Sequence, residues 1–386
     1  MSYHGRFEQA KQPKKDGQPR KKMGAGKIVL IVLAVLLALL LVLAGVAVWY
    51  YNHMMNKMNI VTLPEDTYVY TEEATHAEDT LPPVTETEET TEATAAPTVH
   101  TMNADDIVNI LVVGQASRAG EESHMADTTM LISINTYTKE LTVFSVLRDS
   151  FVKPPYYVDT AGGKHDFGRI KFTTVYNLGY TYPGGVVDAM ALTNSTLRDN
   201  FGVEVDYNVE ISFDGFIKII DYIGGVDIEF SQAEADYLNK DTLYVQRTIE
   251  PGVQRLMGME ALSYARMRKA AGDSESDIKR TERQRKLIES LLERFRNYSI
   301  TKLQNWLDIL LPMVTTTMTP TDIAKLAADV FPILSDMKMT GATIPMQGWG
   351  DMVDIYEDGM IHSVMRFDSN KEKKLIRAIT EAEIAE

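Results

Sequence analysis

Basic side chains concentrate in one short part of this chain, and their density indicates a binding site for a multiply charged anion. Residues 266–286 contain eight Lys or Arg and four Asp or Glu, a local balance of +4, whereas the whole chain carries −15. Several guanidinium forks in one place can overcome the global repulsion that an acidic protein exerts on an anion. The alternative is a solvated helix face that is held by ion pairs.

The spacing of this basic segment brings individual side chains together. On a helix, Arg280, Arg283 and Gln284 occur at i, i+3 and i+4 and therefore share one face. Arg266 and Arg268 share a face if their segment is extended and diverge if it is helical. The spacing predicts that these five side chains surround and bind a pyrophosphate group.

Charged residues at the ends of predicted strands add to this set. Arg148 and Asp149 directly follow a strand, so the pair projects from the end of a sheet, where α/β proteins bind ligands. An edge salt bridge is the alternative. Asp127 opens the neighbouring strand, either as a ligand or as a turn or capping residue. Lys171 follows a glycine-rich stretch, and it is either part of the site or an ordinary loop lysine.

The familiar signatures of other catalytic chemistry are missing. The sequence has no Gly-x-x-x-x-Gly-Lys phosphate loop, no Gly-x-Ser-x-Gly elbow and no His-Glu-x-x-His motif. It has no cysteine, which excludes a thiol nucleophile and a thiolate metal site. Arginine with aspartate and no histidine base suits phosphoryl transfer, in which positioning and charge neutralisation provide most of the catalysis. The acidic balance argues against nucleic acid as the main partner.

The N-terminal part of the chain predicts a membrane anchor. Residues 1–27 hold eight Lys or Arg and two acids, and residues 28–51 form an uncharged, apolar run of 24 that ends in aromatic side chains. At about 1.5 Å per residue, this run can span a hydrocarbon core of roughly 30 Å, with the basic tail in the cytoplasm. We expect an uncleaved single-pass anchor in the cell membrane and not a cleaved signal peptide. Residues 52–103, rich in Thr, Glu and Pro, predict a disordered extracytoplasmic stalk.

From residue 107 onward, strand and helix patterns alternate. The expected strands cover residues 107–113, 129–134, 140–146, 205–211 and 226–230. The expected helices cover residues 186–201, 213–223 and 280–296, and weaker signals follow for a helix at 321–331, an edge strand at 341–345 and a polar helical tail. Such alternation predicts an α/β fold with a central mixed β-sheet and helices packed on its faces. Residues 104–300 would form the main domain and residues 301–386 a C-terminal extension of the same ectodomain.

Taken in order, these segments resemble the LytR-CpsA-Psr family of Gram-positive envelope proteins. The motifs that carry the resemblance are Asn109-Ile-Leu-Val-Val-Gly114, Asp127-Thr-Thr-Met-Leu131, Val146-Leu-Arg-Asp149, Lys171 with Gly184-Gly185, Asp221-Tyr-Ile-Gly-Gly-Val226, Gly258-Met-Glu-Ala-Leu-Ser-Tyr-Ala-Arg-Met-Arg268, Asp277-Ile-Lys-Arg280 and Glu282-Arg-Gln284. Each motif alone is weak. Eight of them in this order, behind a short basic tail and one membrane span, are specific.

The resemblance implies a phosphotransferase that takes a glycopolymer from a polyprenyl-pyrophosphate carrier. The polymer passes through a phosphodiester to a sugar hydroxyl of peptidoglycan, and an apolar cavity between the sheet and the helices holds the polyprenyl chain. By motif, the pyrophosphate is held by Arg148, Arg266, Arg268, Arg280 and Gln284. Asp149 lies beside the head group and Asp127 helps to bind Mg²⁺. The expected substrate-binding set also includes Lys171, Arg283 and Arg118.

Two positions depart from the family pattern. Ala116 stands where the family usually has the aspartate of a Gly-x-Asp motif, and Met125 stands where the family often has the arginine of Arg-Ser-Asp-Thr. One metal carboxylate and one arginine are therefore missing, so we expect Mg²⁺ to bind weakly without substrate. Two alternatives stay open: a regulatory protein that binds lipid pyrophosphate without full activity, and a lipid pyrophosphatase in which water replaces the sugar hydroxyl.

Overall fold

The computed structural model describes residues 51–63, 106–115, 124–158, 163–268, 270, 276–296, 310–357 and 360–380. The chain divides into two compact units, Met1–His53 and Met54–Glu386, and the second contains the sheet and the site. Within the described residues, no helix has both the length and the apolar character needed to cross a membrane. Apart from Tyr51, the predicted span at 28–51 lies outside them.

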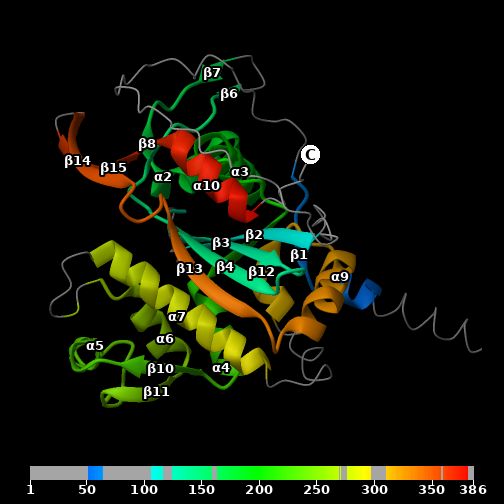
Figure 1. Ribbon diagram of the computed structural model, residues 1–386, viewed down its shortest axis with the longest axis vertical. Coiled ribbons are helices and arrows are strands. Elements are labelled where there is room, and N and C mark those ends of the chain that lie inside the picture. Colours follow the sequence, from blue (N-terminus) through cyan, green and yellow to red (C-terminus); the bar gives the residue numbers. More distant parts are fainter. Residues whose placement is uncertain are drawn as a thin grey trace, which may run out of the picture. The chain divides into compact units, whose positions relative to one another are not determined.

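A seven-stranded sheet forms the centre of the second unit (Figure 1). In spatial order its strands are β1 (Asn59–Ile60), β12 (Val314–Thr316), β9 (Tyr207–Ser212), β2 (Ile107–Gln115), β3 (Ala126–Asn135), β4 (Glu140–Val146) and β13 (Lys338–Ile344). The pairs β2–β3 and β3–β4 are antiparallel, whereas β2–β9 and β4–β13 are parallel. The predicted α/β fold with a central mixed sheet is therefore confirmed.

Alternating side chains of the central strands enter two different cores. On one face, Leu111 and Phe144 pack with the helices α2 (Phe172–Gly179), α3 (Val186–Phe201) and α10 (Ser369–Thr380). On the other face, Met130 and Val143 pack with residues of α7 (Ser276–Arg296) and α9 (Pro320–Val330). Both faces are covered, so the central strands are apolar on both sides.

A third core lies on the far side of α7, in what we call the α4–α6 lobe. This lobe consists of α4 (Phe213–Tyr222), β10 (Val226–Phe230), α5 (Gln232–Leu238), β11 (Gly252–Leu256) and α6 (Gly258–Arg266). Leu287 of α7 is buried in the lobe, whereas the next residue, Ile288, packs toward the sheet. Helix α7 therefore lies between the sheet and the lobe and contributes to both cores (Figure 1).

Helices α4 and α6 approach closely because α6 begins with a glycine. A Cβ atom at Gly258 would lie 2.3 Å from the carbonyl oxygen of Ile217, so a larger residue would push the two helices apart. The Gly258 N–H also donates to Oδ1 of Asp221 at 2.7 Å. This close contact fixes the position of α6, whose last residue is Arg266.

Smaller elements complete the unit. Two-stranded ladders pair β5 (Phe151–Val152) with β8 (Ile170–Lys171), β6 (Tyr157–Val158) with β7 (Lys164–His165), and β14 (Gly350–Glu357) with β15 (Met360–Phe367). Short helical turns occur at η3 (Tyr180–Gly184), η4 (Leu311–Met313) and η5 (Phe331–Ile333). The segment after residue 310 supplies β12 and β13 to the central sheet, so it is an integral part of the fold.

The boundary of the predicted stalk needs correction. We expected a disordered stalk over residues 52–103, but β1 pairs with β12 in the sheet, and Met54 and Met58 are buried. Val61 also packs against the core on the α2–α3 face. The physical reason is that residues 54–63 carry several apolar side chains, unlike the Thr- and Glu-rich part that follows. Residues 64–103 lie outside the described part of the chain.

Candidate active site

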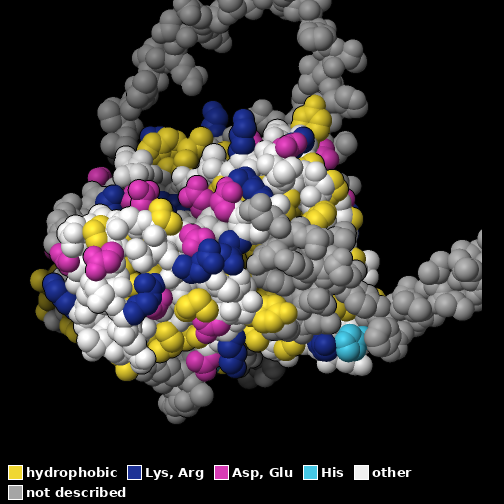
Figure 2. Space-filling model, turned by 90° about the horizontal axis from the view of Figure 1, so that it is seen from below, with side chains coloured by type: hydrophobic (Ala, Val, Ile, Leu, Met, Phe, Trp, Pro, Cys, Tyr) yellow, Lys and Arg dark blue, Asp and Glu magenta, His cyan; other side chains and the backbone are white. Residues whose placement is uncertain are grey.

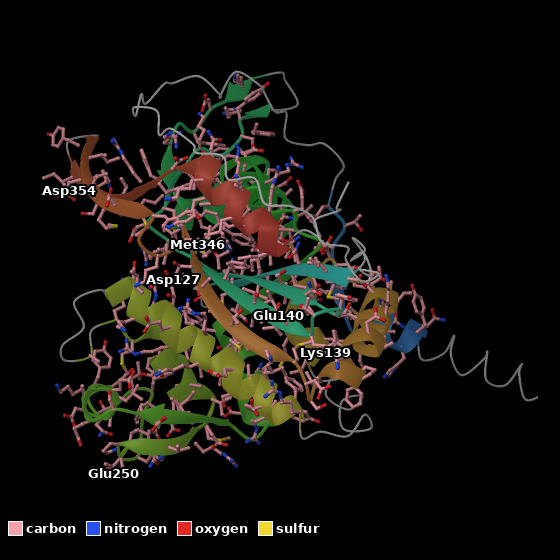
Figure 3. All side chains as sticks on the ribbon, in the orientation of Figure 1. Asp127, Lys139, Glu140, Glu250, Met346 and Asp354 are labelled. Atoms are coloured by element: carbon pink, nitrogen blue, oxygen red, sulfur yellow. The ribbon has the colours of Figure 1, made fainter. Side chains whose placement is uncertain are left out.

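The ends of neighbouring strands bring predicted charged residues together at one edge of the sheet. In the antiparallel pair of β3 and β4, Met130 is opposite Ser145, so the start of β3 lies beside the end of β4. Asp127 comes from the start of β3, and Arg148 follows the end of β4. Nη1 of Arg148 lies 3.4 Å from Oδ1 of Asp127. Figure 3 labels Asp127 at this edge, close to the first turns of α7.

The first turns of α7 bring a buried arginine to the same edge. The Arg280 side chain is only 5% exposed, and its Nη2 lies 3.5 Å from Oδ1 of Asp277, which Arg268 also approaches at 3.9 Å. Burial lowers the pKa of Arg280; Asp277 opposes this effect, and the charges of Arg268 and Arg148 add to it. In the described part of the chain, Nε of Arg280 is buried without a hydrogen-bond partner. A buried donor of this kind normally has an acceptor, so the geometry fits a bound anion.

Arg266 and Arg268 reach the same space because the helix ends between them. Arg266 is the last residue of α6, and Met267 is extended, with φ −60° and ψ 120°. The Arg266 guanidinium lies 5.2 Å from the ring centroid of Phe213 and donates to the hydroxyl of Tyr244 at 3.2 Å. Cation–π contacts hold the planar group in a fixed orientation. The sequence did not decide between a helical and an extended conformation for this segment. In the structure, Arg266 ends the helix and the next residue, Met267, is extended.

Gln284 and Arg283 are neighbours on α7, but only Gln284 faces the site. Gln284 donates to the Thr128 hydroxyl at 2.8 Å, beside Asp127. Nε of Arg283 instead lies 3.0 Å from Oε1 of Glu234, with both side chains buried. The expectation that Arg283 shares a binding face with Arg280 and Gln284 is therefore wrong. Adjacent helical residues point about 100° apart, and Arg283 holds α7 to α5.

Lys171 and Asp149 form an ion pair next to these arginines. Nζ of Lys171 lies 2.8 Å from Oδ1 of Asp149. Burial raises the pKa of Asp149, but hydrogen bonds with Lys171 and Asp277 and the charges of Lys171 and Arg148 outweigh it, so the pKa lies below its ordinary value. Asp149 is therefore ionised at neutral pH and is a weak proton acceptor. It orients cations more effectively than it removes a proton.

The basic segment as a whole divides into a buried and an exposed group. Arg280 and Gln284 are buried at the sheet edge, whereas Lys286 is exposed and Lys279 pairs with Glu282 at 2.9 Å. Figure 2 shows basic and acidic side chains interspersed on one face of the protein. Arg280 and Gln284 stay candidates for the predicted anion site, whereas Lys279 and Glu282 form the ion-paired surface of the alternative interpretation.

A cavity of about 630 Å³ extends from this edge between the sheet and the α4–α6 lobe. Its apolar walls include Val112, Met130, Phe216, Leu262, Leu287 and Leu291. Polar side chains that line it at the sheet edge are Asp127, Arg266, Arg268, Arg280 and Gln284. We call these five residues, together with Arg148, the head-group site. Apolar walls that end at several cations suit an amphiphile with a hydrocarbon chain and an anionic head.

The donor set for a metal is small. Among the described residues, no group of three or more His, Asp or Glu side chains is arranged to hold a metal ion. Asp127 offers one carboxylate beside the cavity. Mg²⁺ usually binds one or two carboxylates together with substrate phosphate oxygens and water. Asp127 thus fits a metal that is shared with a bound phosphate. Ala116 and Arg118 lie outside the described residues.

Three residues of the site were not among those expected from the sequence. Asp277 contacts Arg268 and Arg280, and its i, i+3 spacing from Arg280 was a usable signal. Phe213 and Tyr244 position Arg266, but no local pattern indicates this because Tyr244 is 22 residues away along the chain.

Fold and site together define an α/β protein that can hold an anionic amphiphile. The family model described as "LytR_cpsA_psr family" matches residues 80–374. The chain belongs to this family, as the motifs predicted.

Curated relatives and a solved structure agree with this assignment. The protein named polyisoprenyl-teichoic acid–peptidoglycan teichoic acid transferase TagU, from Oceanobacillus iheyensis, is 31% identical over 211 residues, which cover 53% of this chain and 57% of that protein. The regulatory protein MsrR of Staphylococcus aureus is 28% identical over 286 residues, which cover 72% and 77%. The structure of TagT bound to LIIa-WTA is 21% identical, with a TM-score of 0.52, and the match covers 72% and 92%. This last likeness shows the fold.

Proposed function

We propose that this protein transfers a glycopolymer from a polyprenyl-pyrophosphate carrier to a hydroxyl group of peptidoglycan and leaves a phosphodiester. The observation that carries the proposal is the cavity of about 630 Å³ whose apolar walls end at the head-group site. A polyprenyl pyrophosphate has an apolar chain, which matches the apolar walls, and a charged head, which matches the head-group site. The name of the TagU relative and the ligand of the TagT structure support the same class of reaction.

In this proposal, the head-group site neutralises the pyrophosphate and orients it. The unpartnered Nε of Arg280 donates to a phosphate oxygen, and Arg266 and Arg268 bind the remaining oxygens. Arg148, which Asp127 holds at 3.4 Å, faces the phosphate on which charge develops. The acceptor oxygen attacks the phosphorus on the glycan side, and a new P–O bond forms. The P–O bond to polyprenyl phosphate breaks, that phosphate leaves, and the hydroxyl proton passes to solvent.

We also propose that Mg²⁺ is held jointly by Asp127 and the pyrophosphate oxygens. One carboxylate is a weak site for a metal that prefers near-octahedral oxygen coordination, so binding depends on the substrate. The ion would add charge neutralisation at the pyrophosphate.

The proposed location is the cell membrane, with one span at residues 28–51. The basic tail at 1–27 supports a cytoplasmic N-terminus, and the folded unit then lies outside, next to peptidoglycan. A lipid carrier would reach the cavity from the same membrane.

Binding without transfer is the second candidate function. Met125 stands two residues before Asp127, where the family often has an arginine, and the MsrR relative is named a regulatory protein. One experiment separates the candidates. The full-length protein in detergent is incubated with labelled polyprenyl-pyrophosphate glycan, with and without peptidoglycan fragments. Label in the fragments supports transfer, release of label to water without fragments indicates a pyrophosphatase, and bound but unchanged lipid indicates a regulatory protein.

A further inference from the structure

A second pocket lies at β13, the edge strand that pairs with β4. It has a volume of about 290 Å³, and the residues that line it include Arg285, Gly341, Thr343, Gln347, Trp349 and Leu375. They come from α7, β13, the turn after β13, and α10, and we call the space the β13 pocket.

The order of the strands places this pocket relative to the head-group site. Strands β2, β3, β4 and β13 are consecutive neighbours; the large cavity is lined by β2 and β3, and the second pocket by β13. Because β4 and β13 are parallel, their ends lie at the same edge, where the Leu147 N–H donates to the Ile344 carbonyl at 2.7 Å. Arg148 and Asp149 follow β4, which lies between β3 and β13 in the sheet. Figure 3 labels Met346 just after the end of β13.

Arg285 crosses from α7 to the sheet at the floor of the β13 pocket. Its Nη1 donates to the Ser145 hydroxyl at 2.8 Å and to the Ala342 carbonyl at 3.2 Å. A Cβ atom at Gly341 would lie 2.8 Å from Cδ of Arg285, so the glycine makes room for this crossing. In the described part of the chain, both hydrogen bonds of this guanidinium use Nη1, which leaves Nε and Nη2 as donors for a ligand.

The outer wall of the pocket is an aromatic side chain held by a fixed turn. The backbone N–H of Trp349 donates to the Met346 carbonyl at 3.0 Å. The backbone N–H of Met346 donates to the buried carboxylate of Glu372 at 3.1 Å. Nζ of Lys371 lies 3.9 Å from the centroid of the Trp349 ring. An aromatic face beside Gln347 and a guanidinium is suited to a sugar: the ring packs on its C–H groups, and the polar groups bind its hydroxyls.

We propose that the β13 pocket binds the acceptor sugar of peptidoglycan. This inference rests on the proposed transfer, because only a transferase needs an acceptor. In an in-line displacement the nucleophile and the leaving group lie on opposite sides of the phosphorus. The lipid cavity and the β13 pocket lie at strands on either side of β4, the strand that Arg148 and Asp149 follow, and this order matches the two positions. The volume of about 290 Å³ is at the lower end of ordinary ligand pockets, which suits one sugar unit, and Arg285 favours an acidic substituent on it.

The test compares Trp349→Ala with Tyr356→Ala, an aromatic control that is 77% exposed on β14 and does not line the pocket. In the full-length protein, Trp349→Ala should raise the KM for a peptidoglycan fragment roughly tenfold or more, which is about 1.4 kcal/mol. The kcat and the Kd for polyprenyl pyrophosphate should stay unchanged. Gln347→Ala, at an exposed position, should raise the same KM by a smaller factor. Tyr356→Ala should change none of these values.

A direct binding measurement separates this inference from the proposed transfer. The peptidoglycan fragment alone is titrated into wild type and both aromatic variants, and binding is followed by calorimetry. Loss of binding in Trp349→Ala only is the expected result, and it supports the pocket even if the wild type shows no transfer. Equal binding in all three proteins overturns the inference. It is also overturned if Trp349→Ala weakens binding of the lipid-linked polymer and leaves the fragment unaffected, because the pocket then serves the donor.

Discussion

Arg280→Ala tests whether this buried arginine serves a ligand. In the free protein its Nε has no partner among the described residues, and its distance to Asp277 is 3.5 Å, so its removal breaks little. Burial of the charge already lowers its pKa, which indicates a cost of keeping the group charged inside the protein. A charge-assisted hydrogen bond is worth about 1.5–3 kcal/mol, or roughly 10- to 150-fold in Kd. We expect Arg280→Ala to weaken polyprenyl-pyrophosphate binding by this factor, with little change in melting temperature.

Arg283→Ala is the matched control, three residues further along the same helix. Its side chain is equally buried, but it pairs with Glu234 at 3.0 Å. Removal of one partner from a buried ion pair costs about 3–5 kcal/mol, so this variant should lose stability and retain the lipid affinity of its folded fraction. Titration calorimetry and thermal denaturation of both variants decide the matter. Wild-type affinity in Arg280→Ala, or equal destabilisation of the two variants, would refute the reasoning.

Three further outcomes are expected. Burial raises the pKa of Asp199 to about 6, above its value in the unfolded chain, so this residue makes the fold less stable as the pH rises from about 4 to 6. Asp199→Asn should therefore stabilise the protein at pH 7 by on the order of 1 kcal/mol, after allowance for partial solvent screening, and by nothing at pH 3.5; equal gains in melting temperature at both pH values would contradict this. Mg²⁺ should bind weakly to the free protein and clearly tighter with a pyrophosphate lipid, and Asp127→Asn should remove that gain; tight metal binding without lipid would be the opposite result. Protease added to intact protoplasts should remove the folded unit and spare residues 1–27, and a protected folded unit would reverse the proposed topology.

The sequence predicts the central elements well because their signals are local. Residues 140–146 and 186–201 form β4 and α3 with the predicted bounds. The helix ends where Gly202 adopts φ 70°, a conformation that glycine favours. The strands β1 and β12 were not predicted, since two or three residues give no periodicity and their pairing joins distant parts of the chain. The β14–β15 hairpin was missed as well, because many of its large apolar side chains, such as Met352, Tyr356 and Ile361, are exposed and blur the alternation of apolar and polar residues.

The sequence predicts the position of a site residue only where a single strand or helix determines that position. The sequence placed Arg148 and Asp127 at adjoining strand ends, and the structure brings them together at that edge. For Arg283, helical spacing allows either side of α7, and only the position of Glu234 across the lobe decides between them. The contact of Arg266 with Tyr244 likewise depends on the tertiary fold.

The most direct test of the central claim follows the two phosphorus atoms of the donor separately. A polyprenyl-pyrophosphate glycan labelled at the phosphate next to the sugar is incubated with the full-length protein and peptidoglycan fragments. The account predicts that this label enters the fragments through a phosphodiester, with an equal amount of polyprenyl monophosphate released, and that Arg280→Ala slows both. Release of the labelled phosphate at the same rate without fragments, or no cleavage while the lipid binds tightly, would contradict it.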